Sequence, residues 1–250
     1  MPNSPVAAIL VAAGSGKRLE AASGGKNKVL LTLEGCPLFA YSLRTLANSG
    51  IIGGEMVLVH RPDDREEIES HLQSLGLGER VALVPGGKER FDSVHAGLAR
   101  LAEYPPEIVV IHDAARPFVT VEMIRDSIRM ARESGAATVA IPLTDTLKRG
   151  EEGFLKETLP RQNLYRIQTP QSFQFDLIWT AYLEFMKAPD PQVTDDCMIL
   201  ERRGCPTAIV MGSESNLKVT TPFDLEIAEA LLRKAGFSGA SPQPGPGFRR

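Results

Sequence analysis

Two apolar stretches of this chain end in the residue types that bind phosphate groups. Residues 6–12 run directly into a segment, 14–18, of two glycines followed by a lysine and an arginine. Glycines let backbone N–H groups approach phosphate oxygens closely, and the cations then reach the same oxygens. Residues 107–113 end at Asp113, three positions before Arg116. A carboxylate there suits Mg²⁺, which takes one or two protein carboxylates together with substrate oxygens.

The glycine segment fits neither of the two common nucleotide-binding motifs. A P-loop needs a glycine five residues before its Gly-Lys pair and a Ser or Thr after it. Val11 and Arg18 stand at those positions. A dinucleotide-binding turn needs a third glycine where this chain has Leu19. The segment is therefore a phosphate-binding loop of another kind, or a solvated connection between a strand and a helix.

Two further clusters have both a chemical and a purely structural interpretation. Gly86 and Gly87 precede Ser93, so a flat base could lie against the backbone beside a hydroxyl group, or the glycines make a simple turn. Thr194 is followed by two aspartates that could form a metal pair. We favour Thr194 as the N-cap of a helix whose N-terminus the aspartates stabilise. Asp113 alone could likewise be a cap at the end of its strand.

The elements that must position these residues alternate along the chain. Near-continuous apolar runs, typical of strands buried on both faces, are 6–12, 55–60, 80–85, 107–113 and 136–142. Segments with helical spacing lie between them at 37–48, 64–75, 89–103 and 121–134, the last preceded by Thr120 as a plausible N-cap. Later helices are expected at 174–187, 195–203 and 222–235, with a strand at 207–212. This pattern predicts an α/β fold with a doubly wound, mostly parallel sheet.

Two segments depart from the alternation. Residues 143–172 contain glycines at 150 and 153 between strand-like runs, which indicates a protruding hairpin arm. Long excursions of this kind are usually functional or make oligomer contacts. The Pro/Gly/Ser-rich tail, 237–250, is expected to be disordered, which leaves one domain over 1–236.

The overall composition excludes several classes of protein. A net charge of −3 gives no basic field for nucleic acid, and no run approaches the ~20 apolar residues of a membrane span. Three cysteines without CxxC or Cys/His spacing indicate neither a zinc site nor a disulfide framework. The first apolar run has no preceding cation, unlike a secretory signal. We expect a cytoplasmic protein that binds neither nucleic acid nor membranes.

Seven motifs occur in an order that resembles the 2-C-methyl-D-erythritol 4-phosphate cytidylyltransferase family. They are LVAAGSGKRL…NKVLLTLEGCPL, GGKERFDSV, VIHDAARPF, DTLK, RQNLYRIQTPQSF, TDDCMILE and NLKVTTPFDLEIAEALL, and they cover residues 5–235. The resemblance implies a Rossmann-like nucleotidyltransferase fold with a protruding β-arm through which two copies form a homodimer. It also implies a reaction of CTP with methylerythritol phosphate that uses Mg²⁺ or another divalent cation and releases pyrophosphate, a step of the non-mevalonate isoprenoid pathway.

The resemblance also assigns roles to individual residues. Arg18 and Lys28 match the cations that stabilise the transition state, and Asp113 matches the metal ligand. The positions that match the CTP site are Ala12, Ala13, Gly14, Ser15, Gly16, Arg18, Lys28, Gly87, Ser93, Ala114 and Lys218. The positions that match the sugar-phosphate site are Asp113, Arg116, Thr146, Arg161, Thr194 and Lys218, with Thr146 and Arg161 on the arm and serving the partner subunit.

Two alternatives to this function remain. The ribitol 5-phosphate cytidylyltransferases share the fold, the CTP site and the arm. A non-catalytic CTP-binding protein on the same fold is the other, although a degraded site should have lost at least one of Arg18, Lys28, Asp113 and Lys218. The resemblance assigns no role to Lys26, and Lys88 stands where some members of the family have an acidic residue near the ribose.

Overall fold

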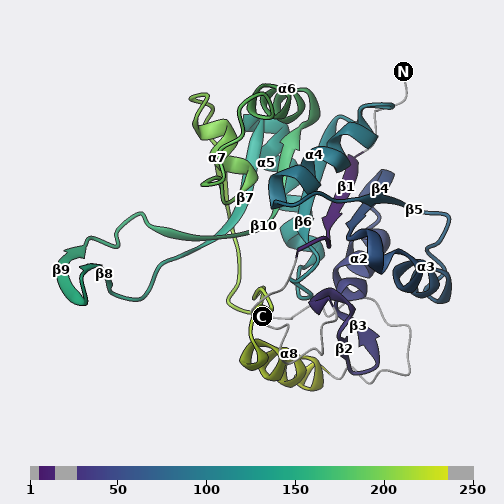
Figure 1. Cartoon of the computed structure of the whole chain (residues 1–250), viewed down its shortest axis with the longest axis horizontal. Coiled ribbons are helices and arrows are strands. Elements are labelled where there is room, and N and C mark those ends of the chain that lie inside the picture. Colours follow the sequence, from purple (N-terminus) through teal and green to yellow (C-terminus); the bar gives the residue numbers. More distant parts are fainter. Residues whose placement is uncertain (1–5, 15–26, 236–250) are drawn as a thin grey trace.

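A computed structural model describes residues 6–14 and 27–235 of the chain. The strands of its main sheet are β1 Val6–Val11, β4 Ile52–His60, β5 Val81–Pro85, β6 Ile108–Asp113, β7 Ala136–Pro142, β10 Tyr165–Gln174 and β11 Ala208–Met211. Their order is β11-β7-β10-β6-β1-β4-β5 (Figure 1). Two smaller pairs lie outside this sheet, β2 Thr32–Leu33 with β3 Cys36–Pro37 and β8 Leu147–Glu151 with β9 Phe154–Leu159.

The sheet is mostly parallel, as the apolar runs predicted. β1 pairs in parallel with β4 on one side and with β6 on the other, and the β4–β5 and β7–β11 pairs are parallel too. The chain builds outward from β1 to β5 and then returns to the other side of β1 with β6. Ligands of open α/β sheets bind at the carboxyl ends of the strands where the order reverses. A site is therefore expected at the carboxyl ends of β1 and β6, where the strand order reverses.

The prediction for residues 143–172 was wrong in its second half. Residues from Tyr165 onward form β10, which lies inside the sheet and pairs antiparallel with β6 and β7. Pro170 and three glutamines interrupt this strand, and a proline in an apolar run argues against a central strand. Its register with β7 shifts between Ile167 and Gln171, which accommodates the irregular stretch.

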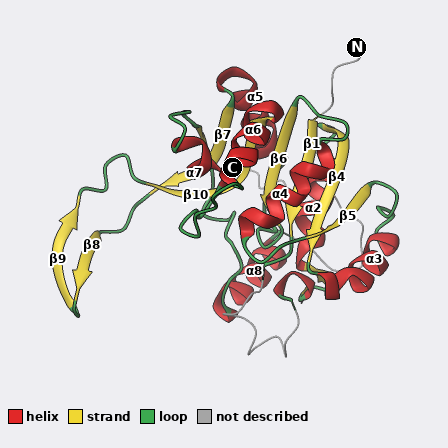
Figure 2. Ribbon diagram, turned by 45° about the horizontal axis from the view of Figure 1, so that its top comes forward, coloured by secondary structure: helices red, strands yellow, loops and turns green. Residues whose placement is uncertain are grey.

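Helices cover both faces of the sheet (Figure 2). They are α2 Leu38–Asn48, α3 Arg65–Ser74, α4 Arg90–Leu101, α5 Val121–Ser134, α6 Phe175–Phe185, α7 Asp196–Glu201 and α8 Pro222–Lys234. Alternate residues of a strand point to opposite faces, and β1 divides accordingly. Ala8 and Leu10 join the hydrophobic cluster of α2, α3, α5 and α8, whereas Ala7 and Ile9 join that of α4, α6 and α7.

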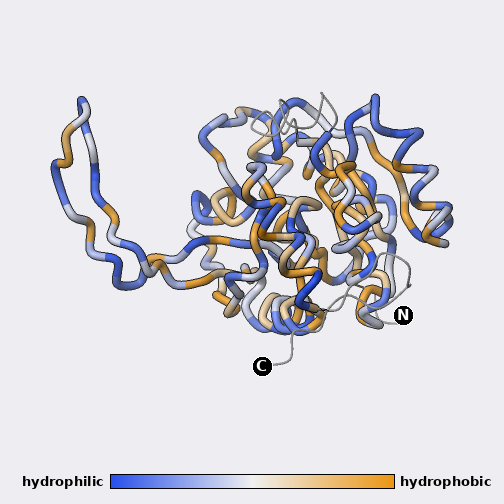
Figure 3. The backbone as a smooth tube through the Cα atoms, turned by 90° about the horizontal axis from the view of Figure 1, so that it is seen from below, coloured by the Kyte–Doolittle hydropathy of each residue, from blue (hydrophilic) through white to orange (hydrophobic). Residues whose placement is uncertain are grey.

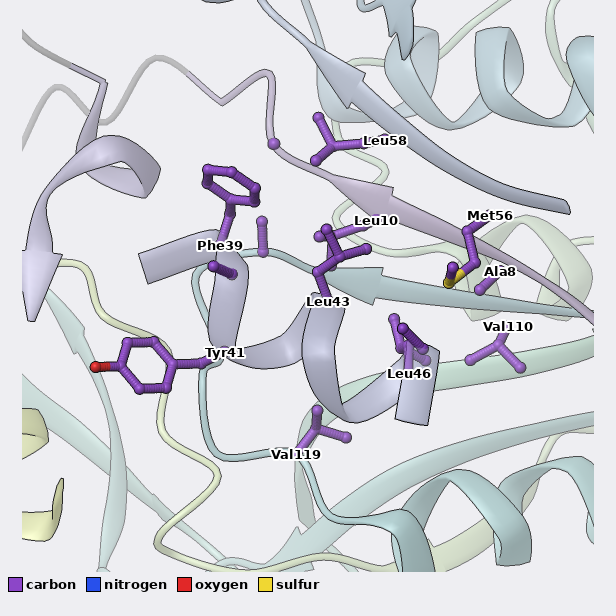
Figure 4. Packing of buried hydrophobic residues seen from close by; sticks show 14 of the residues in the cluster. Ala8, Leu10, Phe39, Tyr41, Leu43, Leu46, Met56, Leu58, Val110 and Val119 are labelled. Atoms are coloured by element: carbon purple, nitrogen blue, oxygen red, sulfur yellow. The ribbon is translucent and has the colours of Figure 1, made fainter. Parts of the chain in front are cut away.

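The first of these clusters is centred on α2. Phe39, Leu43 and Leu46 are almost completely buried, and they pack onto the strands β1, β4 and β6 (Figure 4). Helix α5 contributes to the same cluster, and Thr120 caps it as predicted. The Thr120 side chain accepts a hydrogen bond from the backbone N of Met123 at 3.2 Å. The sheet is thus held between two packed layers, and its strand ends are fixed in position.

The β8–β9 hairpin extends away from the body of the molecule (Figures 1 and 3). Its turn is formed by Glu152 and Gly153, which have φ angles of 50° and 82°. Two large apolar side chains at its end, Phe154 and Leu155, are each 72% exposed. In Figure 3 the hairpin alternates between hydrophilic and hydrophobic stretches, whereas hydrophobic stretches gather inside the body.

No helix in the described part of the chain is long and apolar enough to cross a membrane. The tail for which disorder was expected, 237–250, lies outside the described residues, as do Ser15, Gly16 and Arg18 of the glycine segment.

Candidate active site

A cavity of about 230 Å³ opens at the carboxyl ends of β1 and β6. Its walls come from the end of β1, a short 3-10 helix η1 (Lys28–Leu30), the turn between β5 and α4, the end of β6, and the segment that precedes α8. The lining residues are Val11, Ala13, Gly14, Lys28, Val29, Gly87, Lys88, Glu89, Arg90, Ser93, Asp113, Ala115 and Lys218. Seven of the predicted site residues are therefore brought together from five separate parts of the sequence.

Small residues that follow β1 form one wall of the cavity. Ala13 and Gly14 line it, whereas Ala12 is buried behind them and donates its backbone N–H to the carbonyl of Val59 at 2.8 Å. A Cβ atom placed on Gly14 would meet nothing within 4 Å among the described residues, so its surroundings are open. Small residues here leave backbone amides accessible to a ligand in the cavity.

Lys28 reaches the cavity from η1, which is anchored by the buried Asn27. The Asn27 side-chain amide donates to the carbonyl of Ala12 at 3.0 Å and to Oδ2 of Asp64 at 2.6 Å, and its oxygen accepts from the backbone N of Val29 at 3.3 Å. Lys28 Nζ donates to the carbonyl of Val219 at 3.0 Å. The sequence analysis did not predict Asn27 as a site residue. Its buried side chain holds the backbone in place directly before Lys28.

The turn between β5 and α4 brings backbone very close to its neighbours. A Cβ atom on Gly86 would lie 2.5 Å from Cβ of Ala13, and one on Gly87 would lie 2.3 Å from Cβ of Asp92. The Ser93 hydroxyl accepts from the backbone N of Gly87 and donates to the carbonyl of Glu89, both at 3.3 Å. Glycine is thus sterically required at both positions, which a simple solvent-exposed turn would not demand.

Asp113 is surrounded by cations. Its Oδ2 accepts from Nζ of Lys218 at 2.6 Å, and its Oδ1 accepts from Nε of Arg90 at 3.2 Å. Burial acts to raise the pKa of Asp113, but Lys218, Arg90 and Arg116 outweigh it and hold the pKa well below its ordinary value. The carboxylate is therefore charged at neutral pH, and the structure provides more than the backbone contacts of a simple strand-end cap.

His112 supports the end of β6 from the inside. Its Nε2 lies 3.1 Å from the carbonyl of Arg116, and its Nδ1 lies 2.9 Å from the Thr169 hydroxyl. Burial lowers the His112 pKa to about 4, so the ring is neutral at pH 7. A carbonyl only accepts, so Nε2 carries the proton and Nδ1 accepts from Thr169, whose oxygen accepts from the backbone N of Asp113 at 3.1 Å. This chain of hydrogen bonds fixes the strand end that carries the carboxylate.

The donor set fits a divalent cation that is held mainly by its ligand. Among residues 6–14 and 27–235 there is no group of three or more His, Cys, Asp or Glu side chains that would form a closed protein site. Asp113 supplies one ionised carboxylate inside the cavity. Mg²⁺ commonly takes one or two carboxylates and completes its shell with phosphate oxygens and water, so this arrangement suits it.

Four of the predicted sugar-phosphate residues do not line the cavity. Arg116 donates from its Nη atoms to the carbonyls of Asn216 at 2.8 Å and Ile167 at 3.3 Å. Thr146 and Arg161 are exposed at the base of the hairpin, where Arg161 donates to the carbonyl of Thr144. Thr194 is exposed before α7. Within one chain, only Asp113 and Lys218 of the predicted sugar-phosphate set lie in the cavity wall.

The structure corrects the prediction for the N-cap of α7. Thr194 does not cap α7, because Asp195 is the N-cap and accepts from the backbone N of Met198 at 3.0 Å. A carboxylate at the cap position also stabilises the helix, because its negative charge lies at the positive end of the helix dipole. Ala114, predicted for the CTP site, is fully buried in the core, and the neighbouring Ala115 lines the cavity, so a role for Ala114 stays a prediction.

The sequence interpretation also missed Arg90 as a site residue. Arg90 follows the glycine pair and lines the cavity, yet its Nη1 and Nη2 each donate at 2.9 Å to the two oxygens of Asp196. Burial opposes the charge of Arg90, but Asp196 and Asp113 hold its pKa well above the ordinary value. The available signal was an arginine three residues after the second glycine, at the start of the predicted helix.

The cavity lies where the strand order of an open α/β sheet reverses, and glycines and cations line it. This arrangement is typical of doubly wound proteins that bind phosphorylated ligands. A family model described as 2-C-methyl-D-erythritol 4-phosphate cytidylyltransferase (IspD) matches residues 6–234. The chain belongs to this family, which confirms the resemblance of the seven motifs.

Individual relatives agree with this assignment. Curated 2-C-methyl-D-erythritol 4-phosphate cytidylyltransferases from Alkaliphilus oremlandii and Bacillus licheniformis are 40% and 37% identical over 232 and 224 residues. These matches cover 92% and 90% of this chain, and 96% and 94% of the relatives. The crystal structure of 4-diphosphocytidyl-2C-methyl-D-erythritol synthase from Anaerococcus prevotii has a TM-score of 0.80 and 30% identity, and the match covers 92% of this chain and 96% of that one.

Proposed function

We propose that this chain transfers a cytidylyl group from CTP to 2-C-methyl-D-erythritol 4-phosphate and releases pyrophosphate. The observation that carries the proposal is the cavity at the β1–β6 switch point, where Lys28, Lys218 and Asp113 converge with glycine-bearing backbone. Family membership supports the choice of both substrates. The turn at Gly87 and Ser93 supports a small flat base, since backbone and hydroxyl groups face the same space.

The proposed chemistry is an in-line displacement at phosphorus. An oxygen of the sugar phosphate forms a bond to the α-phosphorus of CTP, and the bond from that phosphorus to the bridging oxygen of pyrophosphate breaks. The attacking oxygen is already an anion, so no residue has to remove a proton. The obstacle is charge repulsion, so positioning and electrostatic stabilisation supply the catalysis. Lys28 and Arg18 are assigned to the charge on the α-phosphate and on the leaving pyrophosphate.

Asp113 is assigned to a divalent cation. Such an ion neutralises charge on the triphosphate oxygens when it is bound. Lys218 now occupies Oδ2 of Asp113 at 2.6 Å. We therefore infer that Lys218 would donate to phosphate oxygens of the substrate if Asp113 held a cation.

The hairpin is proposed to complete the site of a second copy. Thr146 and Arg161 lie at its base and outside the cavity of their own chain, and Phe154 and Leu155 expose apolar surface at its end. Mixing Arg161→Ala with Lys28→Ala protein tests this assignment. A homodimer with shared sites regains activity through mixed dimers, whereas subunits that act independently stay inactive after mixing.

Cys36, Cys197 and Cys205 are free thiols, which supports a reducing compartment such as the cytoplasm.

Pyrophosphate release tests the function as a whole. The wild-type chain is assayed with Mg²⁺, each of the four nucleoside triphosphates, and either methylerythritol phosphate or ribitol 5-phosphate at equal concentration. The proposal expects turnover with CTP and methylerythritol phosphate. Faster turnover with ribitol 5-phosphate would move the chain to the other cytidylyltransferase class, and CTP binding without release would make it a binding protein.

A further inference from the structure

Arg90 connects the cavity to a buried carboxylate that lies behind it. It is the first residue of α4, and its guanidinium makes three hydrogen bonds to two different carboxylates. Both Nη atoms donate to Asp196 at 2.9 Å, and the remaining Nε donates to Asp113 at 3.2 Å. One planar side chain therefore holds two acids whose positions in the sequence are 83 residues apart (196 − 113).

Asp196 is fixed on all sides. It is fully buried, and Oδ1 also accepts from the Tyr182 hydroxyl at 2.5 Å. Its backbone N donates to Oε1 of Gln171 at 3.1 Å, which ties the start of α7 to β10. Burial and the neighbouring Asp196 hold the pKa of Tyr182 well above its ordinary value, so the phenol keeps the proton that it donates. Asp196 therefore faces Arg90 rather than the cavity, which it does not line.

We infer that Arg90 is a positioning residue for the proposed reaction, and that Asp196 and Tyr182 fix the plane of its guanidinium so that Nε orients the carboxylate of Asp113. This inference rests on the proposed function. A two-pronged contact sets the guanidinium plane in a way that a single contact cannot. Arg90 contacts Oδ1 of Asp113 and Lys218 contacts Oδ2, so the two oxygens are held from different sides.

The geometry also predicts that lysine does not replace Arg90. An ammonium group is a point charge on a flexible stem, and it lacks the planar fork that reaches two carboxylates in fixed directions. Arg90→Lys keeps the charge and most of the apolar stem, but it cannot keep the contacts to both Asp113 and Asp196. A displacement of about 1 Å at the reacting groups can reduce turnover about 10²-fold. We expect a loss of about that size in kcat for Arg90→Lys, with a much smaller change in KM for CTP.

The decisive experiment crosses this substitution with Asp113→Asn. Pyrophosphate release is measured under single-turnover conditions, with enzyme in excess, for the wild type, Arg90→Lys, Asp113→Asn and the double variant. If Arg90 acts through Asp113, adding Arg90→Lys to Asp113→Asn lowers the rate by less than about threefold, because the two effects are not additive. Equal losses in both backgrounds would overturn the inference.

Arg100→Lys is the matched control. Arg100 lies on the same helix and makes a two-pronged contact with Glu55, at 3.1 and 2.8 Å, away from the cavity lining. It is expected to leave turnover unchanged. Tyr182→Phe removes only one hydroxyl from the network, so a folded protein with a smaller loss in kcat is expected, and an unchanged rate would contradict the role assigned to Tyr182.

A crystal structure of Arg90→Lys decides the case in which Asp113→Asn is too slow to measure. A rotated or displaced Asp113 carboxylate supports the inference, and an Asp113 in its wild-type position overturns it. Inactivity of the wild type with every substrate pair would contradict the proposed function instead, so the two failures are distinguishable.

Discussion

Substitution of Gly86 by alanine tests whether the close approach of two loops shapes the nucleotide site. Gly86 belongs to the turn after β5, and its backbone N donates to the carbonyl of His60 at 2.8 Å. A Cβ atom there would lie 2.5 Å from Cβ of Ala13 and 2.8 Å from Oγ of Ser93. Carbon atoms in favourable contact lie about 3.5–4.0 Å apart, so the two loops have to separate by about 1 Å.

The magnitude follows from what has to move. The Cβ atom of Ala13 is bonded directly to the backbone that walls the cavity, so no flexible side chain can absorb the clash. A shift of about 1 Å in a binding site costs about 10²-fold in turnover, and overpacking of this kind typically destabilises a fold by about 1–3 kcal/mol. We expect kcat/KM for CTP to fall about 10²-fold while the protein remains folded.

The assay compares Gly86→Ala with Gly78→Ala in pyrophosphate release and in urea unfolding. A Cβ atom on Gly78 would meet only the side chain and Cα of Gln73 at 3.7 and 4.0 Å, which is ordinary contact, and its activity should match the wild type. A Gly86→Ala protein whose kcat/KM stays within threefold of the wild type would refute the steric argument.

Three further predictions address the base-binding turn, a helix cap and a pH effect. Ser93→Ala leaves the Gly87 amide without its 3.3 Å partner, so KM for CTP should rise about tenfold in steady-state kinetics, and an unchanged KM would contradict this role. Thr120→Ala should lower the free energy of unfolding by about 1 kcal/mol in urea, because α5 loses its N-cap. Burial acts to raise the pKa of Asp224, but hydrogen bonds from Thr220 and Thr221 hold it below the ordinary value. Its stabilisation is thus present above the unfolded pKa of about 3.9 and is lost as the pH falls through the folded value. Asp224→Asn should be less stable than the wild type at pH 7, and the difference should shrink below about pH 4 in pH-dependent unfolding.

The strands and helices of this fold were accessible to sequence reasoning where burial is two-sided. β1 and β6 are continuous apolar runs, and α5 carries its apolar residues at helical spacing, so their composition alone indicates their structure. β10 was missed because a central strand with a proline and several glutamines has no such composition. Its place is set by tertiary hydrogen bonds to β6 and β7, which a local pattern does not contain.

Some residues of the site could be predicted from the sequence and others could not, for the same reason. Among the described residues, the meeting of Gly14 and Asp113 in one cavity wall could be predicted, because the carboxyl ends of parallel strands share one edge of the sheet. Arg90 could not, because its importance depends on Asp196, 106 residues further along the chain. The contact exists only after α7 packs beside α6, so no spacing rule reveals it.

The most direct measurement is the rate of pyrophosphate release from CTP and 2-C-methyl-D-erythritol 4-phosphate by the wild type and by Lys28→Ala. Lys28 lines the cavity and is assigned to charge that develops during transfer. Loss of one such stabilising group costs about 10²–10³-fold in turnover. A loss of that size, with the protein still folded and binding CTP, agrees with the proposed role of Lys28 in cytidylyl transfer. A Lys28→Ala protein that turns over within a few-fold of the wild type would contradict it.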